Sequence, residues 1–145
     1  MKVSDAMTPH VRVVSPDQTI WEAAQLMLDL DAGALPVGED GRLVGMITDR
    51  DIAVRAVASR KSPSTKVSEV MTAQVLYCFE DEDLEAVAER MSGQKVRRLP
   101  VVARDKRLVG IISLGDLAQN EETRISGRTT AEISQVGGPH SQAQH

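Results

Sequence analysis

Two short motifs in the chain place a carboxylate three residues after a hydroxyl. Residues 45–51 read Gly-Met-Ile-Thr-Asp-Arg-Asp, and residues 110–116 read Gly-Ile-Ile-Ser-Leu-Gly-Asp. A Thr or Ser followed three residues later by an acid is typical of a capping box, in which both side chains bind free N–H groups at the start of a helix. The same groups could serve a ligand, because a helix N-terminus attracts phosphate and a carboxylate can accept two hydrogen bonds from the cis-diol of a ribose. Each motif alone is compatible with both interpretations.

Both motifs belong to a larger internal repeat. Val-Ser-Asp-Ala-Met-Thr at residues 3–8 returns as Val-Ser-Glu-Val-Met-Thr at residues 67–72, and Leu-Pro-Val at residues 35–37 returns at residues 99–101. Leu-Val-Gly at residues 43–45 returns at residues 108–110, one residue later than the preceding blocks predict. Blocks repeated in the same order with a single slip indicate a tandem duplication.

Each copy predicts the element order β-α-β-β-α from its apolar periodicity. In the first copy the expected elements are a strand over 11–14, a helix over 20–30 ended by Gly33, strands over 34–37 and 43–47 around a turn at 39–41, and a helix over 49–58. In the second copy they are a strand over 75–78, a helix whose apolar face is Leu84, Val87, Ala88 and Met91, strands over 97–102 and 108–112, and a helix from Leu114 onward.

The repeat length determines the expected architecture. A unit of about 60 residues buries only about 60% of its unfolded surface and is marginally stable alone, so the copies should pack against each other. We therefore expect an α+β fold in which two pseudo-symmetric repeats pack sheet to sheet into one module. Residues 1–62 form the first predicted repeat, residues 63–120 the second, and residues 121–145 a flexible polar tail.

Composition excludes several classes of function. The 145 residues carry a net charge of -4, which gives no general attraction to nucleic acid or to an anionic membrane. No apolar run is long enough to span a bilayer and no secretory leader opens the chain, so the cytoplasm is the expected compartment. No metal-ligand spacing and no pair of nucleophile and base is visible, so neither a metal site nor an enzyme is predicted. Cys78, the only cysteine, lies in an apolar run and is expected to be a buried, inert thiol.

The repeated blocks resemble a tandem cystathionine-β-synthase (CBS) domain pair. Each copy contains, in order, Met-Thr, Leu-Pro-Val, and Gly followed by two apolar residues and Thr/Ser-x-x-Asp. The resemblance covers about residues 1–120 and is greatest to short stand-alone bacterial proteins of this family. It implies a regulatory module that binds AMP, ADP or ATP, or alternatively NAD or S-adenosylmethionine, in the cleft between the repeats. It also implies a homodimer, no required cofactor, and a regulated partner on another chain whose identity the sequence does not give.

The same resemblance implies roles for individual residues. Asp51 and Asp116 would bind ribose, and Thr48 and Ser113 would approach phosphate or ribose oxygens. Each motif would meet the segment before Leu-Pro-Val of the other repeat, so that the first faces Val96, Arg97 and Arg98 and the second faces Ala32, Gly33 and Ala34. The expected adenine pocket consists of Met46, Ile111, Ala32, Gly33, Ala34, Val96, Thr8 and Thr72. Gly45 would let the backbone approach the adenine ring closely.

The two expected sites are not equivalent. Arg97 and Arg98 bring two cations to the site of Asp51, whereas Gly33 and Ala34 bring none to the site of Asp116. We therefore expect the Asp51 site to bind more tightly and to depend more on phosphate. A solvated strand edge is the alternative for the arginines, because adjacent strand residues point to opposite faces.

Two other functions stay open from the sequence. A CBS pair without physiological nucleotide binding would act as a structural or protein-interaction module. A nucleic-acid-binding module is disfavoured by the negative charge and by the lack of aromatic residues for base stacking.

Overall fold

A computed structural model describes residues 1–118, which form two compact units. We call residues 1–11 together with 76–118 unit 1, and residues 12–75 unit 2. Each is a mixture of helices and strands, as the sequence predicts. The predicted tail, residues 121–145, lies outside the described residues.

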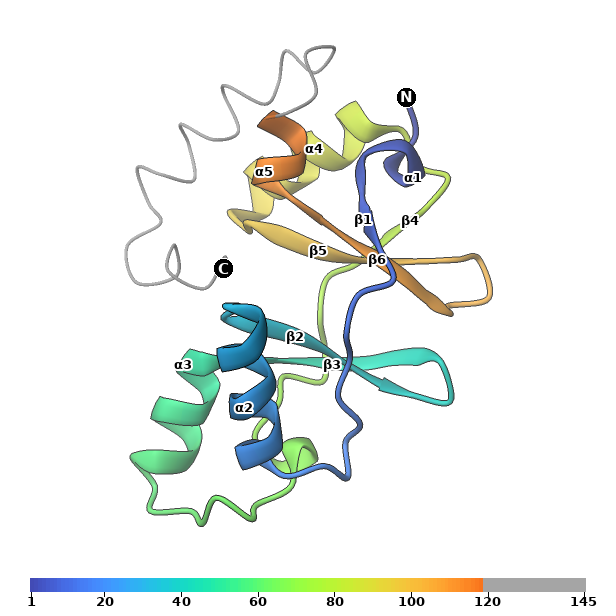
Figure 1. Cartoon of the computed structure of the whole chain (residues 1–145). Helices are drawn as coiled ribbons and strands as arrows, with labels where there is room; N and C mark the ends of the chain where they lie inside the picture. The colour runs from blue at the N-terminus through green and yellow to red at the C-terminus, as the bar shows by residue number, and fades with distance from the viewer. Residues whose placement is uncertain (119–145) are drawn as a thin grey trace. The chain divides into compact units, whose positions relative to one another are not determined.

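Unit 2 is built on a hairpin with helices beside it (Figure 1). Its elements are α2 (Ile20–Leu30), β2 (Ala34–Glu39), β3 (Arg42–Thr48), α3 (Asp49–Asp51), a π-helical segment η1 (Ile52–Val57) and a 3-10 turn η2 (Val67–Glu69). Strands β2 and β3 are antiparallel, and Asp40 and Gly41 both take positive φ in the turn between them, as a tight hairpin requires. The core joins both helices to the hairpin through Ile20, Ala23, Met27, Leu35, Val37, Ile47 and Ala56.

Unit 1 contains a four-stranded sheet with α4 and α5 packed against it (Figure 1). Its elements are α1 (Val3–Ala6), β1 (Thr8–Pro9), β4 (Cys78–Phe79), α4 (Leu84–Gln94), β5 (Arg98–Val102), β6 (Leu108–Ser113) and α5 (Leu114–Ala118). The strand order is β1-β6-β5-β4, with β4 parallel to β5 and the other pairs antiparallel. The predicted apolar face of α4 is buried, and Cys78 is buried beside it as expected.

Several predicted boundaries are wrong. The strand predicted over 11–14 is reduced to a single bridge from Val14 to Val37, and the strand predicted over 75–78 begins only at Cys78. A strand needs a partner edge along its length, and Val13 is 43% exposed with no strand assigned to it. The first long helix ends at Leu30 rather than at Gly33, because Asp31 takes the left-handed conformation that ends a helix.

The most consequential difference is an exchange of the Met-Thr blocks. Residues 3–8 of the first repeat pack in unit 1 with the body of the second repeat, and residues 67–72 of the second repeat pack in unit 2 with the body of the first. Thr8 pairs with Ile111, and Thr72 pairs with Met46. The repeats counted along the sequence, residues 1–62 and 63–120, are therefore a different division from the compact units in space.

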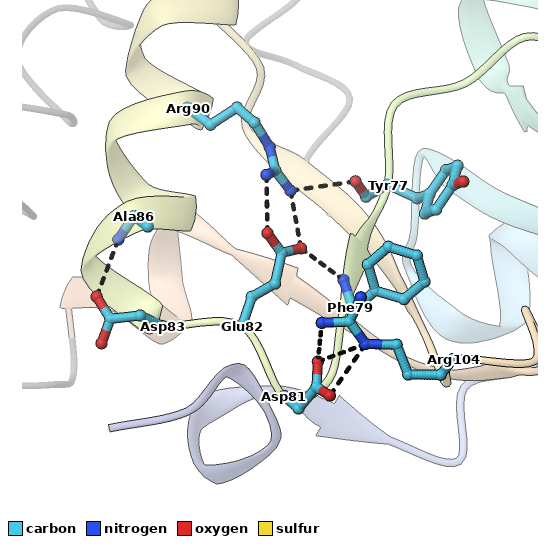
Figure 2. Close-up of polar contacts among 8 residues, drawn as sticks. All are labelled: Tyr77, Phe79, Asp81, Glu82, Asp83, Ala86, Arg90 and Arg104. Atoms are coloured by element: carbon cyan, nitrogen blue, oxygen red, sulfur yellow. Dashed lines mark hydrogen bonds and ion pairs between the residues drawn. The ribbon is translucent and has the colours of Figure 1, made fainter.

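The loop that enters α4 is fixed by two arginine–carboxylate pairs (Figure 2). The guanidinium of Arg104 donates to both oxygens of Asp81 at 2.7–3.1 Å and lies 4.2 Å from the ring centroid of Phe79. Arg90, on α4, donates to both oxygens of Glu82 at 3.0 and 3.1 Å. These bidentate pairs hold β4 and the following loop against α4 and the β5–β6 hairpin of unit 1.

Candidate functional site

Both Thr/Ser-x-x-Asp motifs form the predicted capping box. The backbone N–H of Thr48 donates to Asp51 Oδ2 at 3.0 Å, and the N–H of Asp51 donates back to Thr48 Oγ1 at 3.0 Å. In unit 1 the N–H of Ser113 donates to Asp116 Oδ2 at 2.9 Å, and the N–H of Asp116 donates to Ser113 Oγ at 3.3 Å. The capping interpretation is thus confirmed. The capping hydrogen bonds leave acceptor capacity on both carboxylates, because each ionised carboxylate can accept about four hydrogen bonds.

In unit 2 the capping box lies among residues that the sequence analysis singled out. Thr48 stands opposite Ala34 in the β2–β3 register, and the N–H of Asp49 donates to the carbonyl of Gly33 at 2.9 Å. Met46 exchanges two backbone hydrogen bonds of 2.9 Å with Thr72. We call the following residues the unit 2 cluster: Gly33, Ala34, Met46, Thr48, Asp51 and Thr72.

Unit 1 repeats this arrangement with charged residues added. Ser113 stands opposite Arg98 in the β5–β6 register, and the N–H of Leu114 donates to the carbonyl of Arg97 at 3.0 Å. Both arginines are half-buried, and the solvated strand edge stays the alternative for them. We call the following residues the unit 1 cluster: Thr8, Arg97, Arg98, Ile111, Ser113 and Asp116.

The carboxyl group of Asp116 is electrostatically unusual. Burial raises its pKa above the ordinary value, and this effect exceeds the opposing influence of hydrogen bonds from Ser113 and Thr8 and of the Arg98 charge. A carboxylate that is costly to desolvate gains most from new hydrogen-bond donors. Asp116 is therefore a partly buried carboxyl group whose surroundings disfavour its charged form.

Ala32 and Val96, the outermost members of the predicted segments, have a structural task. The N–H of Ala32 donates to the carbonyl of Met27 at 2.9 Å, and the N–H of Val96 donates to the carbonyl of Met91 at 3.1 Å. Each bond closes the C-terminus of a long helix and fixes how the chain enters the next strand. The two residues thus position the segments that precede Leu-Pro-Val.

Within each unit, a motif lies beside the pre-Leu-Pro-Val segment of its own repeat. Arg97 and Arg98 accordingly lie in the unit that holds Asp116. The pairing implied by the resemblance, in which these arginines serve Asp51, stays a prediction. The same holds for the predicted inequality of the two sites.

Gly45 and Gly110 have a packing explanation that the sequence analysis did not foresee. A Cβ on Gly45 would lie 2.8 Å from both Met71 Sδ and the carbonyl oxygen of Thr72. The close approach that Gly45 permits is therefore made by the chain's own Met-Thr block. Gly110 repeats this geometry against the first Met-Thr block.

Sequence reasoning missed one residue next to the candidate site. Arg55 Nε lies 3.7 Å from Asp51 Oδ1, and Arg55 Nη1 lies within hydrogen-bond distance of the carbonyls of Val70 and Met71. The signal was present, because Arg55 follows Asp51 by four residues, the spacing at which opposite charges meet along a helix.

Comparison with known proteins agrees with the duplicated arrangement. The profile of the CBS domain family matches residues 3–57 and again residues 67–122. The chain belongs to the CBS domain family. As a CBS pair it is similar to the CBS domain-containing protein YhcV of Bacillus subtilis, at 48% identity over 91% of this chain and 94% of that protein.

Solved structures of other CBS proteins share the fold. CBSX2 in complex with AMP superposes with a TM-score of 0.70 at 29% identity, covering 92% of this chain and 98% of that one. The CBS domain pair of MJ0100, in complex with 5′-methylthioadenosine and S-adenosyl-L-methionine, gives a TM-score of 0.69 at 32% identity, covering 82% and 98% of the two chains. The ligands named in both structures contain adenosine.

Two further features bear on the kind of site. In residues 1–118, no group of three or more His, Cys, Asp or Glu side chains is arranged to hold a metal ion. The same residues contain no helix of the length and apolarity that a membrane span needs.

Proposed function

We propose that the chain is a regulatory CBS pair that binds adenosine-containing nucleotides through Asp51 and Asp116. The observation that carries the proposal is the duplication of one polar cluster. In each copy a half-buried carboxylate, already oriented by a capping box, lies beside a strand that pairs with a Met-Thr block. Helix capping alone gives no reason for the surrounding residues to be repeated as well. The adenosine ligands of two CBS relatives support the same function.

Each group has a chemical task under this proposal. The carboxylates of Asp51 and Asp116 accept hydrogen bonds from the ribose diol, and the hydroxyls of Thr48 and Ser113 contact ribose or phosphate oxygens. Met46 and Ile111 supply apolar surface for the adenine ring. AMP, ADP and ATP are the preferred candidates, with NAD and S-adenosylmethionine as alternatives.

Calorimetry of the wild-type chain with these five compounds tests the proposal. Asp51→Asn and Asp116→Asn keep an oxygen for the capping hydrogen bond but remove the charge. Losing two charge-assisted hydrogen bonds should weaken binding at the altered site by about 100-fold or more. Asp49→Asn is the matched control, because Asp49 is exposed and its carboxylate accepts from the N–H of Arg50. Full affinity in both Asn variants would refute the assignment.

Substitution of Arg98 tests whether this arginine acts at the Asp51 site or at the Asp116 site. Arg98→Gln should weaken binding of ATP more than binding of adenosine, since the guanidinium pairs with phosphate. If it serves Asp51, the effects of Arg98→Gln and Asp51→Asn will be non-additive, and if it serves Asp116, the coupling will appear with Asp116→Asn. The first result would support the predicted inequality of the sites, in which the Asp51 site is tighter.

A homodimer that acts on a partner protein in the cytoplasm completes the proposal. Its support is four exposed apolar side chains carried by α2 and η1 of unit 2, since exposed apolar patches often mark protein–protein interfaces. The residues concerned are Trp21, Leu28, Val54 and Val57, which are 54%, 80%, 51% and 66% exposed. Sedimentation of the wild type and of Leu28→Glu tests it, with dimer expected for the first and monomer for the second.

The alternative function is a protein-interaction module without physiological nucleotide binding. If the wild type binds none of the five compounds, the sensor hypothesis fails and this alternative stands. A thermal-shift panel gives the same decision rapidly, since a ligand that binds only the folded state must raise the unfolding temperature.

A further inference from the structure

Arg55 joins Asp51 to a segment of unit 2 that lies 15 and 16 residues further along the sequence than Arg55 itself. It lies in η1, one helical turn beyond Asp51, and its Nε is 3.7 Å from Asp51 Oδ1. Its Nη1 donates to the carbonyl of Val70 at 3.4 Å and to that of Met71 at 3.3 Å. Val70 and Met71 are the two residues before Thr72, whose backbone pairs with Met46. One side chain on η1 therefore contacts both the Asp51 carboxylate and the exchanged Met-Thr block.

The contacts of Asp51 show what Arg55 can do for it. Oδ2 accepts the N–H of Thr48, while Oδ1 faces Arg55. The two contacts approach different oxygens, so together they restrict rotation of the carboxylate about its last bond. Acceptor capacity is left on both oxygens, as binding of a cis-diol requires. The Asp51 side chain is only 15% exposed, which also restricts it to few orientations.

We infer that Arg55 is a positioning residue for Asp51, holding the carboxylate in the orientation that selects a ribose with both hydroxyls. This inference rests on the proposed function and names the determinant of sugar specificity in one of its two sites. Arg55 does not touch the ligand. It acts by fixing the carboxylate relative to the strand that carries Met46 and to the block that carries Thr72.

Arginine suits this position for a geometric reason. Its planar guanidinium offers separate N–H groups to the carboxylate and to the carbonyls, whereas an ammonium is a single point of charge. The second repeat has no equivalent arginine, because the residue four positions after Asp116 is Asn120. Sugar selection by this route therefore belongs to the Asp51 site alone.

The test uses calorimetry to compare the affinities for AMP and 2′-deoxy-AMP in a protein that carries Asp116→Asn. In this background only the Asp51 carboxylate is available to bind the ribose hydroxyls. In this background we expect AMP to bind about 10-fold more tightly, the value of one charge-assisted hydrogen bond. Adding Arg55→Met should reduce that preference to about twofold or less, mainly by weakening AMP, and Arg55→Lys should fall between. Arg50→Met is the matched control, since Arg50 is an exposed arginine on α3, the element directly before η1, and it should keep the preference.

Two results would overturn the inference. One is a sugar preference that survives Arg55→Met, or that Arg50→Met removes equally. The other is the absence of any change in the carbonyl ¹³C shifts of Val70 and Met71 on Arg55→Met, because the lost hydrogen bonds must alter those shifts. A merely stabilising role would lower the affinity for both nucleotides by the same factor. If the background protein binds both nucleotides and only the preference is insensitive, the proposed function survives. If the wild type binds neither nucleotide, the proposed function fails, and the role of Arg55 fails with it.

Discussion

Gly110→Ala should destabilise unit 1, although it adds only one methyl group. That methyl would lie 2.7 Å from the carbonyl oxygen of Thr8 and 2.8 Å from Met7 Sδ. Met7 can rotate away, but the carbonyl belongs to strand β1, which is paired to β6 at this point. The substitution therefore forces β1 away from its partner.

The expected magnitude follows from two opposing contributions. Overpacking of this kind costs about 1–3 kcal/mol. Restricting the unfolded chain by replacing Gly with Ala returns about 0.4–1 kcal/mol. We expect a net loss of about 1–2 kcal/mol in the free energy of unfolding. Gly45→Ala should act in the same direction in unit 2, since its methyl would meet the carbonyl of Thr72 at 2.8 Å.

Gly93→Ala is the matched control within unit 1. Gly93 lies in α4, and a Cβ there would meet no other atom within 4 Å. The same chemical change should stabilise the protein by about 0.5–1 kcal/mol, because Ala favours a helix over Gly. Urea unfolding followed by far-UV circular dichroism measures both variants. If Gly110→Ala is as stable as the wild type, or if both variants shift in the same direction, the explanation from the exchanged block is refuted.

Three further outcomes are expected. The hydrogen bond from Arg90 lowers the pKa of Glu82. The stability that Glu82 contributes is therefore present above its unfolded pKa and is lost as the pH falls through the lowered folded pKa. In urea titrations at a series of pH values, Glu82→Gln should reduce the loss of unfolding free energy at acid pH. Burial raises the pKa of Cys78 to about 12, so a disulfide reagent at neutral pH should label the thiol only after unfolding in urea. Asp31 and Lys95 end their helices at φ values of 52° and 57°, so Asp31→Gly and Lys95→Gly should each raise the unfolding free energy by about 1 kcal/mol.

The sequence predicts most of the regular structure, because periodicity is strong where an element packs on one core. The long helices over Ile20–Leu30 and Leu84–Gln94 and both hairpins lie close to where their apolar patterns place them. The short strands were misplaced, since two-residue strands are determined by partner edges and not by their own composition. The π-helical form of η1 has no pattern of its own in the sequence.

The sequence predicts several residues that cluster within one unit, but it does not predict how each cluster is assembled. Duplication in the sequence shows that Thr48 and Asp51 have counterparts, and it places Met46 and Ala34 near them. It does not show which Met-Thr block pairs with which Gly, because a repeat is consistent with both pairings. Arg55 was overlooked for a related reason. Its contacts with Val70 and Met71 span a turn and a linker that carry no periodic signal.

The exchange of the Met-Thr blocks has a consequence for how such a chain can arise. A solitary repeat with this geometry would lack the segment that fills the space above its own glycine, because its own copy of the segment reaches elsewhere. It could be completed only by borrowing that segment from another molecule of its kind. Fusion of two such genes would place both exchanged segments in one chain. Cleavage of that chain between its repeats would then leave each half without the Met-Thr segment that packs on its glycine.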